Sequence, residues 1–334
     1  MALRSRSALA ATLTLFLAGC PKGPERPKTD LPPLVTAPLT SITQGPRARW
    51  AVLTRPDALF GGELGPWVSA IVPKAGLDKL EVRLGFDLRK SSEALVVGYP
   101  AATFYAARLP AGASPGVALD AYALRLLAPV SKATPRPDLE RRIGGLASGG
   151  KGSAAAMWSK NGDVIVGESG RLEPVVTSMA LATGRLRAGL SLQAEKSFAP
   201  LAAWAAGAPL ALYALCPLAE VLGTKPEEAP ISTQECFGAM LTLRAGKPGT
   251  LDVALRLTGA WGKDKEAAAS EVGAALDRIA ASDLGKALGL RDAGKAQIES
   301  SAEAITVHLV VDGKALAGGL ARLLSSELKD ATGP

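Results

Sequence analysis

His308 is the only histidine of the 334-residue chain, which limits the chemistry that the sequence can perform. A zinc site with two histidines is excluded, and neither His-Glu-x-x-His nor Cys-x-x-Cys occurs. A Ser-His-Asp triad would have to use His308. Alternation places His308 in the middle of a strand, on the face opposite Ile305 and Val307, whereas catalytic histidines are more common on loops or at strand ends. We therefore expect His308 to be a structural or surface residue.

A glycine-rich segment, GGLASGGKGS at 144–153, contains two partial nucleophile or phosphate motifs. It approaches a phosphate-binding loop, but Gly152 stands where a serine or threonine must hold magnesium. Ser148 and Lys151 have the Ser-x-x-Lys spacing of penicillin-binding enzymes, yet two intervening glycines oppose the helical turn that this chemistry needs. The partner motifs Ser-Asp-Asn and Lys-Thr-Gly are absent. The sequence therefore predicts a glycine loop, no cofactor and no catalytic residue.

The remaining acidic and aromatic residues give no clear site. Glu227 and Glu228 are adjacent in KPEEAP, and such a pair in a proline-flanked loop is usually a solvated tip. The five tryptophans are widely scattered along the chain, so we interpret each as a core anchor. A fold can still bring distant carboxylates together, which keeps a hydrolase based on carboxylates or serine as an alternative.

The N-terminal residues indicate export. Arg4 and Arg6 precede about ten uncharged, mostly apolar residues, 8–17, which are too few for a transmembrane helix of roughly 20 residues. The tetrad Leu17, Ala18, Gly19, Cys20 that follows resembles the lipobox of bacterial lipoproteins. The resemblance implies cleavage of a signal peptide, residues 1–19, and acylation of Cys20. The acyl chains, palmitate among them, would then hold the protein on a membrane. An ordinary secretory signal with an incidental cysteine is the alternative.

Two further cysteines, Cys216 and Cys236, would lie in an oxidising compartment if the chain is exported. A disulfide between them is then the default expectation, and it would stabilise the fold by roughly 3 kcal/mol in the chain-entropy model. Two buried free thiols remain an alternative. A metal pair lacks nearby ligand spacing.

Composition describes a tether followed by a folded body. Residues 20–46 are rich in proline and are expected to form an extended, lipidated tether that spans up to roughly 80 Å. The rest has a core built mainly from alanine, leucine and valine, since hydrophobic residues make up 48% of the chain and aromatic ones only 4%. The net charge of +7 is spread out, so we expect no nucleic-acid partner and at most a mild attraction to anionic lipid or cell-wall polymer.

One uncharged stretch, 198–219, is long enough to cross a membrane. Three prolines and Gly207 interrupt it, so we interpret it as a helix, a turn at Gly207 and a strand buried on both faces. A membrane span is the alternative.

Other elements have clear local signals. Asn161 and Gly162 predict a two-residue hairpin. Helices are expected at 114–127, with Ser114 as the N-cap, at 172–180 and at 264–281, with Asp283 capping a short continuation. Strands are expected at 235–246 and 249–262, followed by the third helix, a strand at 303–313 and a terminal helix from about Lys314.

These elements predict an α+β fold of antiparallel sheets covered by helices. The segments 84–99 and 288–309 both run from Leu-Gly through a polar turn into a strand, which suggests two similar halves at 47–190 and 191–330. The layout resembles uncharacterised bacterial envelope lipoproteins with two α+β halves.

The sequence leads to one functional hypothesis and two rivals. We expect a non-catalytic envelope lipoprotein that binds or scaffolds a ligand, an envelope protein or a cell-wall partner. We expect it on the outer membrane facing the periplasm rather than on the inner membrane. A groove between the halves would be the default ligand site. The rivals are the hydrolase named above and a carrier of an apolar ligand.

Overall fold

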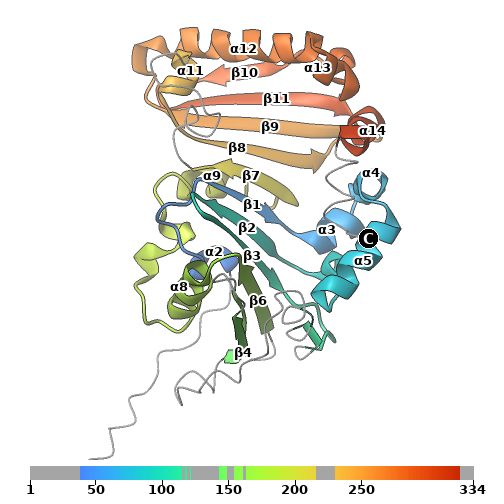
Figure 1. Ribbon diagram of the computed structural model, residues 1–334. Coiled ribbons are helices and arrows are strands. Elements are labelled where there is room, and N and C mark those ends of the chain that lie inside the picture. Colours follow the sequence, from blue (N-terminus) through green and yellow to red (C-terminus); the bar gives the residue numbers. More distant parts are fainter. Residues whose placement is uncertain are drawn as a thin grey trace, which may run out of the picture. The chain divides into compact units, whose positions relative to one another are not determined.

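The computed structural model describes residues 38–114, 117–118, 121, 143–148, 154–160, 163–215 and 230–323. These residues form helices and antiparallel strands (Figure 1), which confirms the predicted α+β class. The described residues all belong to one compact unit. The predicted signal peptide, lipobox and most of the tether lie outside the described residues.

The described strands form a single eleven-stranded sheet in the order β10-β11-β9-β8-β7-β1-β2-β3-β6-β5-β4 (Figure 1). The strands are β1 Trp50–Thr54, β2 Ala94–Tyr99, β3 Ala102–Arg108, β4 Ile143–Ser148, β5 Ala154–Lys160, β6 Asp163–Ser169, β7 Leu210–Ala214, β8 Cys236–Ala245, β9 Thr250–Gly259, β10 Gln297–Ser300 and β11 Ala304–Asp312. Every neighbouring pair is antiparallel. The two predicted halves thus share one sheet, because β1 pairs directly with β7.

The two halves of the sheet follow the same strand order. Outward from the centre, the N-terminal half runs β1-β2-β3-β6-β5 and the C-terminal half runs β7-β8-β9-β11-β10, with β4 as an extra edge strand in the first. The central pair places Val52 opposite Leu212 in an antiparallel register. This order is what two similar halves would produce, while their common origin and the boundary at residue 190 stay predictions.

Short helices connect and cover these strands. They are α2 Leu39–Ile42, α3 Pro56–Gly61, α4 Gly65–Ile71, α5 Lys74–Leu84, α8 Leu172–Ala182, α9 Ala199–Trp204, α11 Ile231–Gln234, α12 Lys265–Ala281, α13 Asp283–Ala287 and α14 Gly313–Leu323. The 3₁₀ turns are η1 Leu88–Lys90, η3 Ala188–Leu190, η4 Leu192–Ala194, η6 Gly262–Asp264 and η7 Leu290–Asp292. In Figure 1, α2 and α8 lie toward one end of the sheet, and α12 and α13 toward the other.

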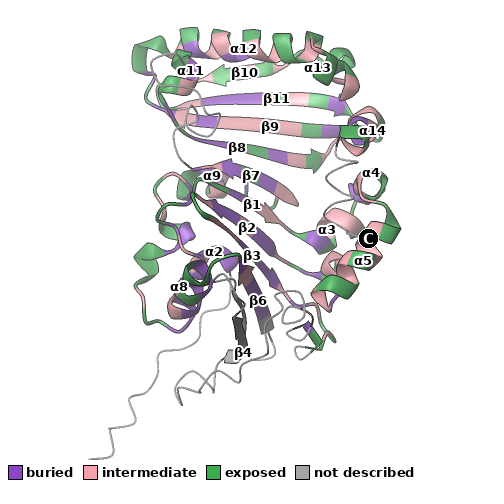
Figure 2. Ribbon diagram, viewed as in Figure 1, coloured by how far each residue is buried: buried purple, intermediate pink, exposed green. Residues whose placement is uncertain are grey.

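Each face of the sheet is identified by one residue of β3. Cross-strand partners put Phe104 on the same face as Val97, and Val97 on the same face as Ala51, so we call this the Phe104 face. Tyr105 and its partner Val96 lie on the opposite face, the Tyr105 face. Figure 2 shows buried residues along β2, whereas Ala51 is the buried residue of β1.

In the N-terminal half, the main core lies on the Phe104 face. Phe104 and Val97 are fully buried there against residues of α2, α8 and α9, among them Val175 and Leu201. Tyr105, the next residue of β3, is 46% exposed. Alternation along one strand therefore separates a packed face from a partly open one.

In the C-terminal half, the core lies on the Tyr105 face. The register passes from Leu212 to Leu241, Leu255 and then Val307, which is 2% exposed. Ala268 and Val272 of α12 pack against this end of the sheet, in one cluster with Val307. The largest helix-packed cluster thus lies on the Phe104 face in the N-terminal half and on the Tyr105 face in the C-terminal half, while a smaller cluster around Phe86 and Ala107 packs on the Tyr105 face of the N-terminal half.

Several local predictions are confirmed. Lys160 pairs with Asp163 across the Asn161-Gly162 hairpin, and α8 and α12 occupy the predicted ranges. The Ser114 hydroxyl accepts a hydrogen bond from the Val117 N–H at 3.5 Å, as an N-cap would, although most of that predicted helix lies outside the described residues.

Other local predictions are wrong in informative ways. Strand β10 was not expected, because its short sequence QIES lacks an apolar run. Ser282 rather than Asp283 caps α13, since its hydroxyl accepts from the Gly285 N–H.

The uncharged stretch folds as a short helix, a turn and a strand. α9 ends at Trp204, Gly207 has a positive φ of 78°, and β7 follows. The strand is not buried on both faces, because Leu212 is 38% exposed. Among the described residues, no helix combines the length and apolarity that crossing a bilayer requires.

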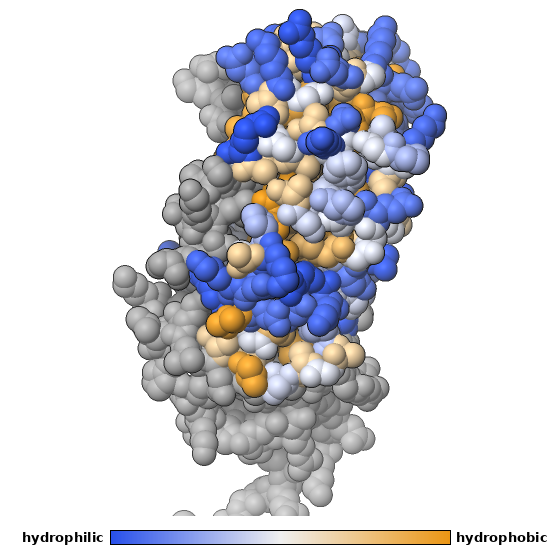
Figure 3. All heavy atoms as spheres, turned by 90° about the vertical axis from the view of Figure 1, so that its right-hand side faces the viewer, coloured by the Kyte–Doolittle hydropathy of each residue, from blue (hydrophilic) through white to orange (hydrophobic). Residues whose placement is uncertain are grey.

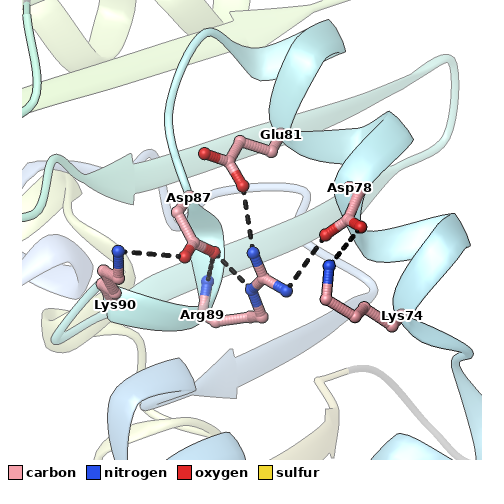
Figure 4. Close-up of polar contacts among 6 residues, drawn as sticks. All are labelled: Lys74, Asp78, Glu81, Asp87, Arg89 and Lys90. Atoms are coloured by element: carbon pink, nitrogen blue, oxygen red, sulfur yellow. Dashed lines mark hydrogen bonds and ion pairs between the residues drawn. The ribbon is translucent and has the colours of Figure 1, made fainter.

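A charged cluster joins α5 to η1, and its members are Lys74, Asp78, Glu81, Asp87, Arg89 and Lys90 (Figure 4). The Arg89 guanidinium pairs with Asp87 at 2.6 Å and with Glu81 at 3.0 Å. Asp87 also accepts from the Arg89 backbone N–H. Burial raises the pKa of Asp87, but the hydrogen bonds from Arg89 outweigh it and leave that pKa lowered. The cluster fixes the connection between α5 and β2.

Candidate functional site

A cavity of about 430 Å³ lies where the two halves of the sheet meet, on the Phe104 face. Its lining residues are Pro38, Leu53, Arg55, Ser92, Glu93, Arg108, Ala202, Ala205, Ala206, Gly207, Ala208, Ala211 and Tyr213. We call it the junction pocket, because Leu53 of β1 and Ala211 and Tyr213 of β7 contribute to it. Its volume falls within the range of small-molecule sites in proteins.

The segment between α9 and β7 builds one wall of the junction pocket. This segment, residues 205–208, consists of alanines and Gly207, whose small side chains leave open space beside the sheet. The next residue, Pro209, anchors the turn to the end of β1: its carbonyl accepts from the Thr54 hydroxyl at 3.0 Å and from the Arg55 N–H at 2.9 Å. The wall is therefore held in place by hydrogen bonds to the other half of the sheet.

An ion pair forms a second wall. Arg108 donates to Glu93 at 3.0 Å, and both side chains are only 15% exposed. The second Glu93 oxygen accepts from the Leu39 N–H at 2.9 Å, which ties the pair to the start of α2. Each Glu93 oxygen therefore already accepts a hydrogen bond from the fold.

Tyr213 supplies an unused polar group to the junction pocket. The residue is 3% exposed, and its ring packs against Phe198 with centroids 4.8 Å apart. No described residue accepts a hydrogen bond from its hydroxyl. Burial raises the pKa of Tyr213 to about 12, so the hydroxyl remains a neutral donor at physiological pH. A hydroxyl that lacks a described partner, on a nearly buried residue that lines a pocket, is suited to donate to a ligand oxygen.

Arg55 supplies the free charge of the pocket. Its side chain is exposed, and no acidic group of the described residues lies within ion-pair distance of its guanidinium. The nearby Asp57 carboxylate accepts from the Ala58 N–H at 2.7 Å at the start of α3. Arg55 thus adds a positive charge beside an ion pair that is itself neutral.

A second, larger hollow of about 830 Å³ lies between α4, α13 and α14, on the side of the molecule that faces the viewer in Figure 3. Three of its charged side chains already serve the fold. Asp312 accepts from the Ala315 N–H at the start of α14, Arg322 donates to the Ala287 carbonyl, and Lys286 pairs with Asp283. This hollow is better explained by the packing of short helices.

The sequence-predicted site residues do not gather at either cavity. Cys20 and Cys216 lie outside the described residues. Cys236 is a buried free thiol that donates to the Gly238 carbonyl at 3.2 Å, and burial raises its pKa to about 11. The disulfide between Cys216 and Cys236 therefore stays a prediction.

Neither His308 nor any described residue of the glycine segment is among the residues that line the junction pocket. His308 is exposed on β11, and its ring centroid lies 6.0 Å from that of Trp204, over which Arg256 stacks at 5.5 Å. Ser148 lies in β4 rather than on a helix, while Lys151 is outside the described residues, as are the paired acids of KPEEAP. Within the described ranges, no group of three potential ligands could hold a metal ion.

Comparison with known proteins adds no assignment, since no family model, curated protein or solved structure matches the chain. The residues that build the junction pocket were not singled out by sequence reasoning. One feature of the sequence could have indicated it. The turn before β7 consists of alanines and Gly207, and such small side chains leave space beside a strand. Nothing in the spacing of Arg55, Glu93 and Arg108 indicated that they would meet there.

Proposed function

We propose that the protein is a lipid-anchored envelope protein that binds a small molecule in the junction pocket without transforming it. Tyr213, a residue only 3% exposed whose hydroxyl has no hydrogen-bond partner among the described residues, lines this pocket of small side chains and is the observation that carries the binding role. The lipobox-like tetrad that ends at Cys20 supports the anchor.

The chemistry of the pocket supports binding over catalysis. Glu93 accepts hydrogen bonds at both oxygens, so it is poorly placed to take a proton from a substrate. Tyr213 has a pKa raised to about 12, which makes it a weak base or nucleophile at neutral pH. Both groups are suited to hold and orient a ligand.

The binding role is tested with 1-N-phenylnaphthylamine, a neutral apolar dye that fluoresces when it leaves water. Ala202→Leu places extra volume in the junction pocket, whereas Ala203→Leu alters the neighbouring residue of α9, which does not line it. We expect saturable dye binding to the wild type and to Ala203→Leu, with at least a tenfold loss in Ala202→Leu. Equal binding by both variants, or no saturable binding, would contradict the proposal.

The anchor is tested separately by metabolic labelling with an alkyne-tagged palmitate. We expect label in the wild-type protein and none in Cys20→Ala, with Cys236→Ala as a control that keeps the label. Label that persists in Cys20→Ala would rule out the anchor and leave the pocket proposal intact.

A carrier of an apolar ligand is the second candidate, and the alanine lining of the junction pocket favours it. A carrier must release its ligand to a second site, whereas a sensor or scaffold need not. Transfer of the bound dye from the protein to phosphatidylcholine vesicles, faster than dye leaves the protein in buffer alone, would support the carrier.

A further inference from the structure

We propose that the ligand of the junction pocket is a small amphipathic anion, with a carboxylate head and a short aliphatic body. This inference rests on the proposed function, because it names the ligand class of the same pocket. It is drawn from the charges at the pocket, from the hydrogen-bonding groups left unused, and from the chemistry of the walls.

The charges favour a negative ligand. The Arg108–Glu93 pair is internally neutral, with an N···O distance of 3.0 Å. Arg55 adds one positive charge, and no described acidic side chain compensates it within ion-pair distance. A guanidinium matches a carboxylate with two parallel hydrogen bonds, which makes a carboxylate head the natural complement.

The unused hydrogen-bonding groups point the same way. Arg55 offers only donors, and the Tyr213 hydroxyl offers one donor beside its acceptor oxygen. The one carboxylate that lines the pocket, Glu93, already receives the Leu39 N–H and the Arg108 guanidinium. A ligand that brings acceptor oxygens therefore matches the unused donors of Arg55 and Tyr213.

The walls favour an aliphatic body over a polar one. Apart from the polar groups already named and Ser92, the lining consists of glycine, proline, leucine and alanine. Small side chains such as Ala205 and Ala211 form smooth apolar surfaces without donors. A short unbranched chain can lie along them, and its burial contributes about 0.8 kcal/mol for each methylene.

The experiment compares three probes that share a ten-carbon chain and differ in the head: decanoate, decanol and decyltrimethylammonium. Each is titrated against the protein loaded with 1-N-phenylnaphthylamine. We expect decanoate to displace the dye at concentrations at least tenfold lower than decanol. We expect the ammonium probe to be the weakest of the three.

Matched variants test whether Arg55 and Tyr213 bind the carboxylate head of decanoate. Arg55→Gln should abolish the preference for decanoate over decanol, and Tyr213→Phe should reduce decanoate affinity several-fold. Arg187→Gln removes an exposed arginine that does not line the pocket, and it should leave the preference unchanged. Arg55 is exposed, so its replacement is not expected to disturb folding.

The outcomes separate this inference from the proposed function. Dye binding with equal displacement by decanoate and decanol, or a preference for decanoate that survives in Arg55→Gln, would overturn the carboxylate inference while the binding role stands. Absence of saturable dye binding to the wild type would overturn the binding role, and the ligand class with it.

Discussion

The two halves of the sheet have the same strand order, but the largest buried cluster of each half lies on a different face, with a smaller cluster around Phe86 and Ala107 on the Tyr105 face of the N-terminal half. In the N-terminal half, Phe104 is fully buried and its neighbour Tyr105 is 46% exposed. In the C-terminal half, Val307 of the Tyr105 face is 2% exposed, whereas Val310 of the opposite face is 50% exposed. Strand order alone therefore does not determine which face of a sheet becomes the core.

The junction pocket lies where the helices that pack on one half of the sheet end and those of the other half begin. The central strands β7 and β1 carry α9 on the Phe104 face, while Leu212 and Trp50 of the Tyr105 face are 38% and 36% exposed. Neither set of helices extends fully over this region, and the small residues after α9 leave the junction pocket. A site at the meeting of two covered regions is a common location for ligands.

The largest expected effect comes from a neighbouring pair in β3. Phe104→Ala should lower the free energy of unfolding by about 3–5 kcal/mol, because it opens a cavity in the N-terminal core. Tyr105→Ala should cost about 1 kcal/mol or less. Urea denaturation measures both values. Similar losses would mean that both faces of β3 are packed and would break the comparison.

The corresponding pair in β11 tests the C-terminal half. Val307→Ala should cost about 2 kcal/mol, since it removes two buried methyl groups, and Val310→Ala should stay within about 0.5 kcal/mol. The same denaturation experiment applies. A larger loss for Val310→Ala would place the core of this half on the Phe104 face.

The charged cluster at α5 belongs to the N-terminal half and gives a pH-dependent prediction. The pKa of Asp87 is lowered from 3.8 in the folded protein, so its stabilising contribution is present above that value and is lost as pH falls through the lowered pKa. Asp87→Asn should therefore cost about 1 kcal/mol at pH 7, and the difference from wild type should vanish at acidic pH.

Urea denaturation at pH 7 and at several values between pH 5 and pH 2 checks this prediction. Asp283→Asn is the control, because the fully exposed Asp283 pairs with Lys286 on the surface and should contribute little at any pH. A difference between wild type and Asp87→Asn that persists at the lowest pH would contradict the assigned role.

Two tyrosines on the Phe104 face allow a hydroxyl that donates a hydrogen bond within the protein to be compared with one that does not. Tyr99 donates to the Gln44 carbonyl at 2.7 Å, so Tyr99→Phe should cost about 1 kcal/mol. Tyr213→Phe should be neutral or slightly stabilising, because no described residue accepts from that hydroxyl. A loss of stability in Tyr213→Phe equal to that in Tyr99→Phe would indicate a protein partner.

The Tyr213 hydroxyl also gives an alkaline signature. Its folded pKa of about 12 exceeds the ordinary value of 10.0, so its contribution to stability is intact below pH 10 and is lost as pH rises through the folded pKa. Wild-type stability should therefore fall more steeply between pH 10 and pH 12 than that of Tyr213→Phe. Parallel pH profiles would contradict the burial of this hydroxyl.

Local patterns in the sequence predicted local structure well. The Asn161-Gly162 pair fixed a hairpin, and apolar spacing gave α8 and α12, because turn chemistry and helical periodicity act over a few residues. The pairing of β1 with β7 joins segments about 160 positions apart, and no local pattern encodes it. β10 has too few residues to show alternation.

The candidate site was less predictable than the fold. A groove between the halves was expected in general terms, but its residues depend on where the largest helix-packed cluster changes faces. Tyr213 was assigned to a strand, and the strand period alone could not show that its hydroxyl would lack a partner. Arg55 follows β1 directly, where a single charge usually indicates only a solvated strand end.

The central claim is that ligands bind in the junction pocket, and methyl NMR of protein labelled at its alanines with ¹³C tests it most directly. On addition of decanoate, we predict that the methyl signals of Ala205, Ala208 and Ala211 shift in a saturable manner. Shifts confined to Ala315 and Ala317, which line the hollow beside α14, or no saturable shifts at all, would contradict the account.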